Sequence, residues 1–450
     1  MKVLKILGIV LIVLLVLLVG GVFYLTRFVN TPEFKQQVLD AANKAAGTDV
    51  KVGEMKVSLF SGIDLQNVAV ANPEGFTGSL VTVKSFALHY RLLPLLQKRV
   101  EVETLAFDSP VITLAKNNKG DWNYEKLGGP SEQISATAKS AAAKPTSSGS
   151  GGLDIAVSRI ELKHASVVML NDSGKELLRI TDANFTSSVN LSGSQLTGSG
   201  RASIEQAVAA NSLFIHKVST PVAITTDAVK LAPLTGKVAD GDITGDAGLT
   251  LTGGSKYSVN LQVKNADVVK LIQEAGVAKR VFSSGKLQLS TALTGTGGLA
   301  TMAGSGKAEI TGGQLVDIPV LNLLATLLQI SALQNLKFDE CRLEYTIANN
   351  VMETPVISLK SPQVQITGKG SVALEDYSLN HTLTLTLAKG TLDSTPKEVR
   401  SIFTQQDDGS FTLEFKVWGP YDAPKTDLEK RVLKGAADQL LQKGLQKLLK

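Results

Sequence analysis

Cysteine and aromatic residues are scarce in this chain. Its 450 residues include one cysteine, Cys341, and aromatic side chains make up 5% of the total. A single cysteine excludes a disulfide framework, and its position excludes lipid attachment to a cysteine near the N-terminus. Few aromatics together with 40 glycines are typical of a long, repetitive β-structure with many tight turns, rather than of a compact enzyme.

Net charge is also low. The formal charge is +5, and residues 425–450 account for +4 of it, because they hold seven Lys or Arg against three Asp or Glu. Nucleic-acid binding normally requires a basic patch across a whole domain. The rest of the chain is nearly neutral, so we exclude a nucleic-acid partner.

The sequence contains no pattern typical of a catalytic, metal or cofactor site. No G-x-S-x-G motif is present, and Gly304–Lys307 lacks the first glycine and the following Ser or Thr of a phosphate loop. None of the histidines has zinc-ligand spacing with Cys341. We expect the four histidines to be ordinary strand residues: His89, His164, His216 and His381. The prediction is a protein that is not an enzyme and has no cofactor.

One long uncharged run is present, from Ile6 to Thr26. As an α-helix, these residues would span about 31 Å, the thickness of a bilayer's hydrocarbon core. A cleaved signal peptide has a shorter apolar run and a small-residue cleavage site, and Gly20-Gly21 keeps that alternative open. We expect an uncleaved transmembrane anchor over residues 1–28, with the body exported to the periplasm of a Gram-negative bacterium, because long domains translocate largely regardless of flanking charge.

Apolar and polar residues alternate with a period of two through most of the remaining chain. A helix is expected first, starting at Thr31-Pro32 and ending at Gly47. Helical patterns interrupt the strands only at Val268–Ala278 and Ile318–Leu333. Since crossover helices are few, we predict a mainly β, antiparallel fold. The clearest strands of the second half are Ile160–Leu170, Tyr257–Val263, Leu287–Leu293, Val364–Thr367, Thr382–Leu387 and Phe411–Val417.

Composition also suggests the domain organisation. Residues 130–152 contain almost no large apolar side chain, so they are expected to form a flexible linker. This linker would separate an αβ module over 29–129 from a β-rich body over 153–424. Residues 425–450 are expected to form a basic amphipathic helix, which either closes the end of the sheet or lies on an anionic membrane. The candidate membrane-surface residues are Lys430, Arg431, Lys434, Lys443 and Lys447.

Several short segments follow one another in a distinctive order. They are Gly62–Leu65, Asn72–Phe76, Leu93–Leu96, Phe107–Leu114, Gly120–Asn123, Gly306–Leu324, Phe338–Leu374 and Val417–Pro424. Taken with the N-terminal apolar run, these segments resemble those of AsmA-family proteins. The resemblance covers both ends of the chain, whereas residues 185–280 are similar only in their general strand-like residue pattern.

The resemblance implies an inner-membrane-anchored periplasmic protein involved in outer-membrane assembly. It also implies an elongated, curled antiparallel sheet whose U-shaped groove is apolar and carries lipid. The alternation fits an open groove and equally a closed sandwich, because apolar faces point inward in both. Candidate groove-lining residues are Leu383, Leu385, Leu387, Phe411, Leu413, Phe415 and Val417.

Two functions agree with these expectations. The first is binding or transfer of phospholipid along the groove, with no chemical step. The second is a membrane-tethered scaffold or assembly factor that holds envelope proteins without transferring lipid. Charged residues placed in the groove would abolish the first function and spare the second.

Overall fold

The structure, a computed structural model, describes residues 31–58, 62–91, 94, 99–127, 154–192, 194–252, 255–276, 281–297, 301–393, 395–428 and 430–431. The expected anchor over 1–28 and the expected linker over 130–152 lie outside the described residues. Among the helices that are described, none combines the length and the apolar character needed to cross a membrane.

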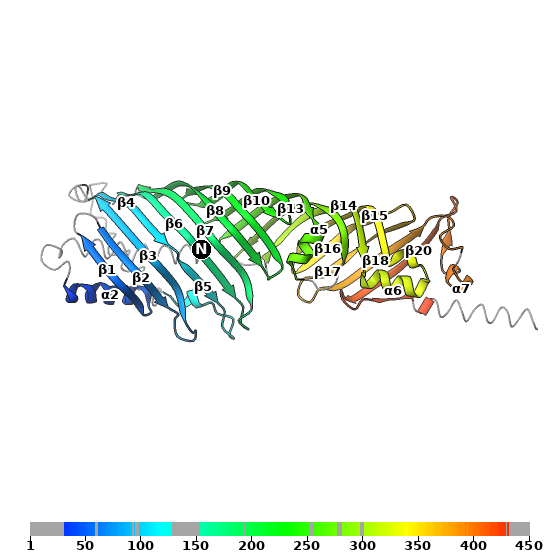
Figure 1. Cartoon of the computed structure of the whole chain (residues 1–450), viewed down its shortest axis with the longest axis horizontal. Coiled ribbons are helices and arrows are strands. Elements are labelled where there is room, and N and C mark those ends of the chain that lie inside the picture. The colour runs from blue at the N-terminus through cyan, green and yellow to red at the C-terminus, as the bar shows by residue number, and fades with distance from the viewer. Residues whose placement is uncertain are drawn as a thin grey trace, which may run out of the picture. The chain divides into compact units, whose positions relative to one another are not determined.

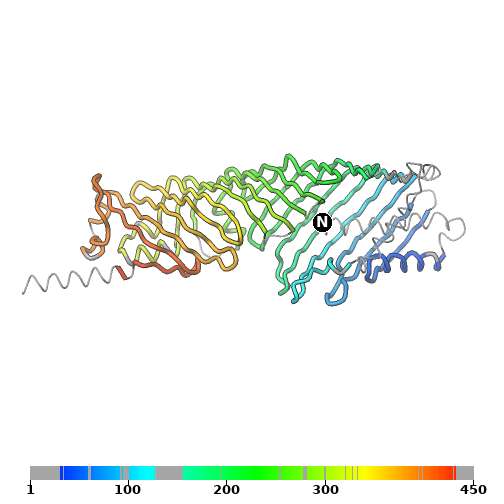
Figure 2. The backbone as a smooth tube through the Cα atoms, turned by 180° about the vertical axis from the view of Figure 1, so that it is seen from behind, coloured from blue at the N-terminus to red at the C-terminus, as the bar shows by residue number. Residues whose placement is uncertain are grey.

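The chain divides into two compact units. Unit 1 comprises residues 1–236 and 247–255, and unit 2 comprises residues 237–246 and 256–450. The described strands belong to one mixed sheet of 21 strands. Within each unit, neighbouring strands run side by side with a common slant, as Figures 1 and 2 show.

Unit 1 begins with one helix and continues as strands. Its elements are α2 (Pro32–Ala46), β1 (Val50–Ser58), β2 (Gly62–Ala71), β3 (Ser79–Arg91), β4 (Arg99–Asp108), β5 (Val111–Ala115), η1 (Asn123–Lys126), β6 (Asp154–Leu170), β7 (Glu176–Ser192), β8 (Gln195–Ala209), β9 (Leu213–Thr225) and most of β10 (Ala228–Val238).

In unit 2, several short helices interrupt the described strands. Its elements are part of β11 (Gly241–Thr250), then β12 (Lys256–Asp267), α5 (Val268–Glu274), β13 (Phe282–Thr296), β14 (Ala303–Val316), α6 (Pro319–Leu328), η3 (Ser331–Leu333), β15 (Asn335–Ala348), β16 (Val351–Lys360), β17 (Val364–Ala373), β18 (Ser378–Leu387), α7 (Lys397–Arg400), β19 (Thr404–Gln405), β20 (Phe411–Pro420) and β21 (Lys425–Thr426).

The helices predicted to start at Pro32, Val268 and Ile318 are confirmed. Helix α2 starts at Pro32 and ends before Gly47, whose φ of 68° and N–H bond to the Asn43 carbonyl at 2.9 Å terminate the helix. The pattern at Val268–Ala278 gives α5, and the pattern at Ile318–Leu333 gives α6 followed by η3. The four histidines lie in strands β3, β6, β9 and β18, as expected.

The prediction of an entirely antiparallel sheet is wrong in unit 1. Most neighbouring strands pair as antiparallel hairpins, but β6 pairs in parallel with both β4 and β5. A parallel pair needs a connection of a dozen or more residues, and the 38 residues from 116 to 153 that join β5 to β6 are long enough. A parallel pairing was not expected because the sequence of this connection carries no helical pattern that would mark a crossover.

Candidate functional site: an apolar face in unit 2

One face of the sheet in unit 2 is apolar from β12 to β15. Residues that pair across neighbouring strands point to the same side of a sheet. Leu289 of β13, for example, lies opposite Val263 of β12 and Ala308 of β14. The members of this apolar face are Tyr257, Val259, Leu261 and Val263 on β12, Leu287, Leu289 and Leu293 on β13, Ala308 and Ile310 on β14, and Leu343, Tyr345 and Ile347 on β15.

The side chains of the apolar face are half-buried, except for Val263, which is buried. The described elements that contact β13 extensively are its neighbours β12 and β14 and the short helix α5. Helix α5 lies at one end of the strand, where Val268 approaches Gly285. The side chains in the middle of the face keep part of their apolar area exposed, since they are half-buried rather than buried. Partly exposed apolar surface of this extent makes the face a candidate binding site.

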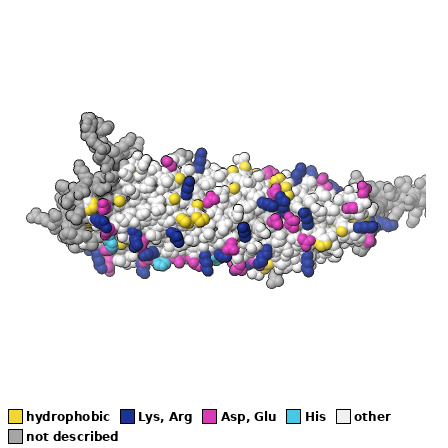
Figure 3. All heavy atoms as spheres, turned by 90° about the horizontal axis from the view of Figure 1, so that it is seen from above, with side chains coloured by type: hydrophobic (Ala, Val, Ile, Leu, Met, Phe, Trp, Pro, Cys, Tyr) yellow, Lys and Arg dark blue, Asp and Glu magenta, His cyan; other side chains and the backbone are white. Residues whose placement is uncertain are grey.

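The opposite face of the same strands is polar. Gln262, Ser290, Lys307 and Glu344 are successive neighbours across β12 to β15. The surface view in Figure 3 likewise shows acidic and basic side chains interspersed, with hydrophobic side chains only in small groups. The alternation of each strand thus produces one apolar face and one face that water solvates.

Aromatic rings lie over glycines on the apolar face. Tyr257 covers Gly295 on β13, and Tyr345 covers Gly306 on β14, so that a Cβ at either glycine would collide with the phenol. An aromatic ring that covers a glycine on the neighbouring strand restores packing at a position without a side chain. Each ring therefore lies against the sheet, in the space that the missing side chain of the glycine leaves.

A hollow of about 720 Å³ lies over β11 to β15. Each of these five strands contributes three consecutive residues to its lining, and the central residues are Gly245, Leu261, Thr291, Gly306 and Tyr345. The residues on either side of this central row include Gln262, Ser290, Lys307 and Glu344 of the polar face, and the lining contains neither Leu289 nor Leu343, so the hollow does not mark the apolar face.

Helix α6 covers a different part of the same side of the sheet. Its buried residues Leu324 and Leu328, with Leu333 of η3, form one core with strands β14 to β20. The core also includes Leu428, the first helical residue after β21. The end of unit 2 that contains β17 to β20 is therefore closed by helices.

The seven predicted groove-lining residues all lie in or against this closed core. Leu385, Leu387, Leu413, Phe415 and Val417 are buried, and Leu383 and Phe411 are partly buried against them. They share one face, since Leu385 pairs with Leu413 and Leu383 with Phe415. In this structure α6 covers them, so their contact with lipid stays a prediction. The sequence analysis recognised the strands of the open apolar face but did not select their residues, because nothing local indicates where α6 packs.

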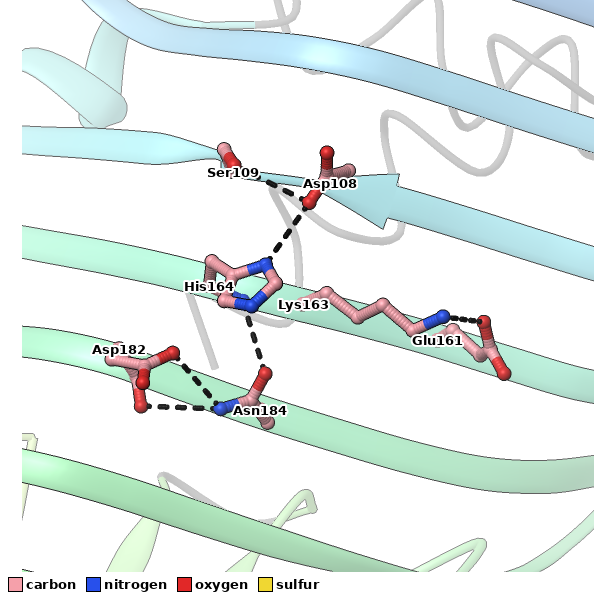
Figure 4. Close-up of polar contacts among 7 residues, drawn as sticks. All are labelled: Asp108, Ser109, Glu161, Lys163, His164, Asp182 and Asn184. Carbon is pink, nitrogen blue, oxygen red and sulfur yellow. Dashed lines mark hydrogen bonds and ion pairs between the residues drawn. The ribbon is translucent and has the colours of Figure 1, made fainter.

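A polar cluster lies on neighbouring strands of unit 1 (Figure 4). The cluster contains Ser109, which follows β4, His164 of β6 and Asp182 of β7. The φ of each of these residues is 51–52°. His164 Nδ1 lies 3.2 Å from Asp108 Oδ1, and this hydrogen bond lowers the pKa of the Asp108 carboxyl. The Ser109 hydroxyl donates to Asp108 rather than to His164. The cluster thus stabilises bulged backbone and does not contain a nucleophile paired with a base.

Two titratable groups belong to the apolar side of unit 2. Burial raises the pKa of the Cys341 thiol to about 11. Burial lowers the pKa of His381, whose Nε2 lies 3.1 Å from the Thr354 hydroxyl. Both shifts have the same physical cause, since an apolar environment disfavours the charged form.

The C-terminal candidates are described only in part. Lys430 and Arg431 are exposed, whereas Lys434, Lys443 and Lys447 lie outside the described residues. Arg431 donates to the Glu414 carbonyl and pairs with Asp427, which also accepts the Lys416 N–H at 2.9 Å. The beginning of the predicted helix is therefore fixed to β20. Within the described part of the chain, no group of His, Cys, Asp or Glu could hold a metal ion.

Comparison with known proteins gives one match. The model of the AsmA family matches residues 1–207, which include α2 and strands β1 to β7. No curated protein and no solved structure matches the chain significantly. The segments quoted from the N-terminal half thus find independent support, and the resemblance to the AsmA family is confirmed over residues 1–207.

Proposed function

We propose that this protein binds phospholipid through its acyl chains on the apolar face of unit 2. It would work at the bacterial inner membrane, anchored by residues 6–26 with its body in the periplasm, and contribute to building the outer membrane. The match to the AsmA family and the large β-sheet agree with such a role.

The observation that carries the proposal is the continuous apolar face from β12 to β15, whose side chains are only half-buried. Tyr257, Leu289 and Leu343 are half-buried by their neighbours on the sheet. Acyl chains lying on this face would remove the remaining apolar area from water, at roughly 25 cal/mol per Å². Their binding requires neither a charged group nor a fixed headgroup geometry. We therefore propose a non-enzymatic carrier or transfer protein.

Site-specific photo-crosslinking tests this proposal on one strand. A benzophenone amino acid at Leu289 or Leu293 should capture phospholipid in cells. The same residue at Gln288 or Thr294, on the exposed polar face, should capture much less. Equal capture at the two pairs of positions, or lipid-free protein after purification, would rule out lipid binding on this face.

A charge substitution separates lipid binding from a scaffold role. Leu289→Asp should remove co-purifying lipid and abolish the protein's activity in cells, whereas Gln288→Asp should change neither. If Leu289→Asp lost lipid but kept activity with an intact fold, the protein would instead act as a membrane-tethered scaffold for envelope proteins.

A further inference from the structure

Two exposed tyrosines form an aromatic corner at neighbouring turns of unit 2. Tyr377, in the turn between β17 and β18, is 58% exposed, and Tyr421, after β20, is 63% exposed. The turns are adjacent because Ser378 pairs with Pro420. The ring centroids are 6.4 Å apart and the rings are inclined at 81°. Two apolar rings thus meet at nearly a right angle in a solvent-exposed position.

Backbone strain places Tyr377 in this corner. Its φ is 56°, a left-handed conformation that bulky residues rarely adopt and that glycine or asparagine adopts readily. The Tyr377 N–H donates to the Ala373 carbonyl at 3.0 Å, which fixes the turn. A glycine would form the same turn without strain. A strained, exposed tyrosine is therefore better explained by binding than by stability.

Three acidic residues are adjacent in sequence to the tyrosines of the corner. Glu375, Asp376 and Asp422 are exposed and flank the two tyrosines in sequence. Asp376 Oδ1 accepts the Ser378 N–H at 3.0 Å, and hydrogen bonds from Ser378 lower the pKa of this carboxyl, so that it stays ionised. The turn residues 374–378 and 420–424 contain no Lys or Arg. Lys416 and Lys425 lie on the adjoining strands, beside Trp418 rather than at the tyrosines.

We propose that the aromatic corner, Tyr377 and Tyr421 with Glu375, Asp376 and Asp422, docks a basic segment of a partner polypeptide by receiving an arginine or lysine side chain. A cation is attracted to the faces of aromatic rings, and two rings at a right angle can both contact it. The carboxylates add long-range attraction. They also oppose approach to the phosphates of a lipid surface, which favours a polypeptide over a membrane.

Binding of a labelled arginine nonapeptide to the full-length protein in detergent, followed by fluorescence anisotropy at low salt, tests this proposal. Tyr377→Gly should weaken binding at least tenfold without lowering the thermal midpoint, because glycine accepts the φ of 56°. The triple variant Glu375→Gln, Asp376→Asn, Asp422→Asn should weaken binding by a similar factor. Leu213→Ala, which removes another exposed apolar side chain, at the start of β9 next to a turn, should leave it unchanged.

Other results would overturn the proposal. If Tyr377→Gly bound the peptide as tightly as the native protein, the tyrosines would have no role. If only the charge variant lost binding, the attraction would be non-specific. If phosphatidylethanolamine vesicles bound in a Tyr377-dependent manner and the peptide did not, the corner would be a membrane contact.

Discussion

The ring of Phe338 on β15 occupies the space where a side chain at Gly313 on β14 would begin. The two residues pair across the strands, and a Cβ at Gly313 would overlap three carbon atoms of the ring. Phe338 is 3% exposed and belongs to the core under α6. Its ring therefore has little freedom to move aside.

Gly313→Ala should destabilise the protein by about 1–3 kcal/mol, because overpacking a filled core forces side chains and backbone to shift. Gly295→Ala is the matched variant, since Tyr257 covers Gly295 in the same way. Tyr257 is half-buried on the open apolar face, so its ring can turn aside and the cost should be clearly smaller. Urea denaturation measures the loss of unfolding free energy in both variants. Equal losses would mean that the rings of Phe338 and Tyr257 are packed equally tightly.

A second prediction concerns the covering of β17 to β20 by α6. Leu328 is fully buried in this core, whereas Thr326 on the same helix is exposed. Leu328→Ala should cost about 2–5 kcal/mol by leaving a cavity, and Thr326→Ala should change stability by less than about 0.5 kcal/mol. A small loss for Leu328→Ala would show that α6 does not pack there in solution.

The strands and helices of this fold are predictable from local patterns, whereas the covering of the sheet is not. Leu383, Leu385 and Leu387 alternate with threonines, as do the apolar residues of β13 with their polar neighbours. The same pattern thus gives a closed core in β18 and an open face in β13. The difference depends on where α6 packs, and that contact joins segments dozens of residues apart.

The parallel pairing of β6 is a similar case. Residues 128–153 carry no pattern that specifies a strand partner, yet Val100 of β4 pairs with Ile155 directly after them. By contrast, the ends of α2 were predictable because Pro32 and Gly47 act through their own backbone preferences. The ends of α2 depend on local backbone preferences and could be predicted, whereas the partner of β6 depends on long-range packing and could not.

Cys341 should be unusually unreactive in the folded protein. Its pKa is raised to about 11 from 9.0, so the thiolate fraction near pH 8 is about 100-fold lower than for an ordinary cysteine. Alkylation by iodoacetamide should be slower by at least this factor and should accelerate in urea. The control is Cys341→Ala with Thr346→Cys, which places a thiol on the exposed face of the same strand. Similar rates for the two thiols would contradict the burial of Cys341.

Stability should fall in acid through His381. Burial lowers the pKa of this imidazole in the folded state, while in the unfolded chain it titrates near 6.5. Below about pH 6.5 the unfolded chain therefore binds a proton that the folded protein does not, and the free energy of unfolding decreases as the pH falls. Above this pH both states are neutral and the effect vanishes.

The measurement compares urea denaturation at pH 7.5 and pH 5.0. His381→Gln, which keeps a hydrogen-bonding group near Thr354 but cannot titrate, should lose a clear part of the acid destabilisation seen in the native protein. His216→Gln, at a half-buried strand position, should retain it. If the two variants showed the same pH dependence as the native protein, a group other than His381 would be responsible. Because His381 pairs with Val417 on β20, a confirmed effect would also mean that acid weakens the closed end of unit 2, where α6 covers the predicted lipid-contact residues.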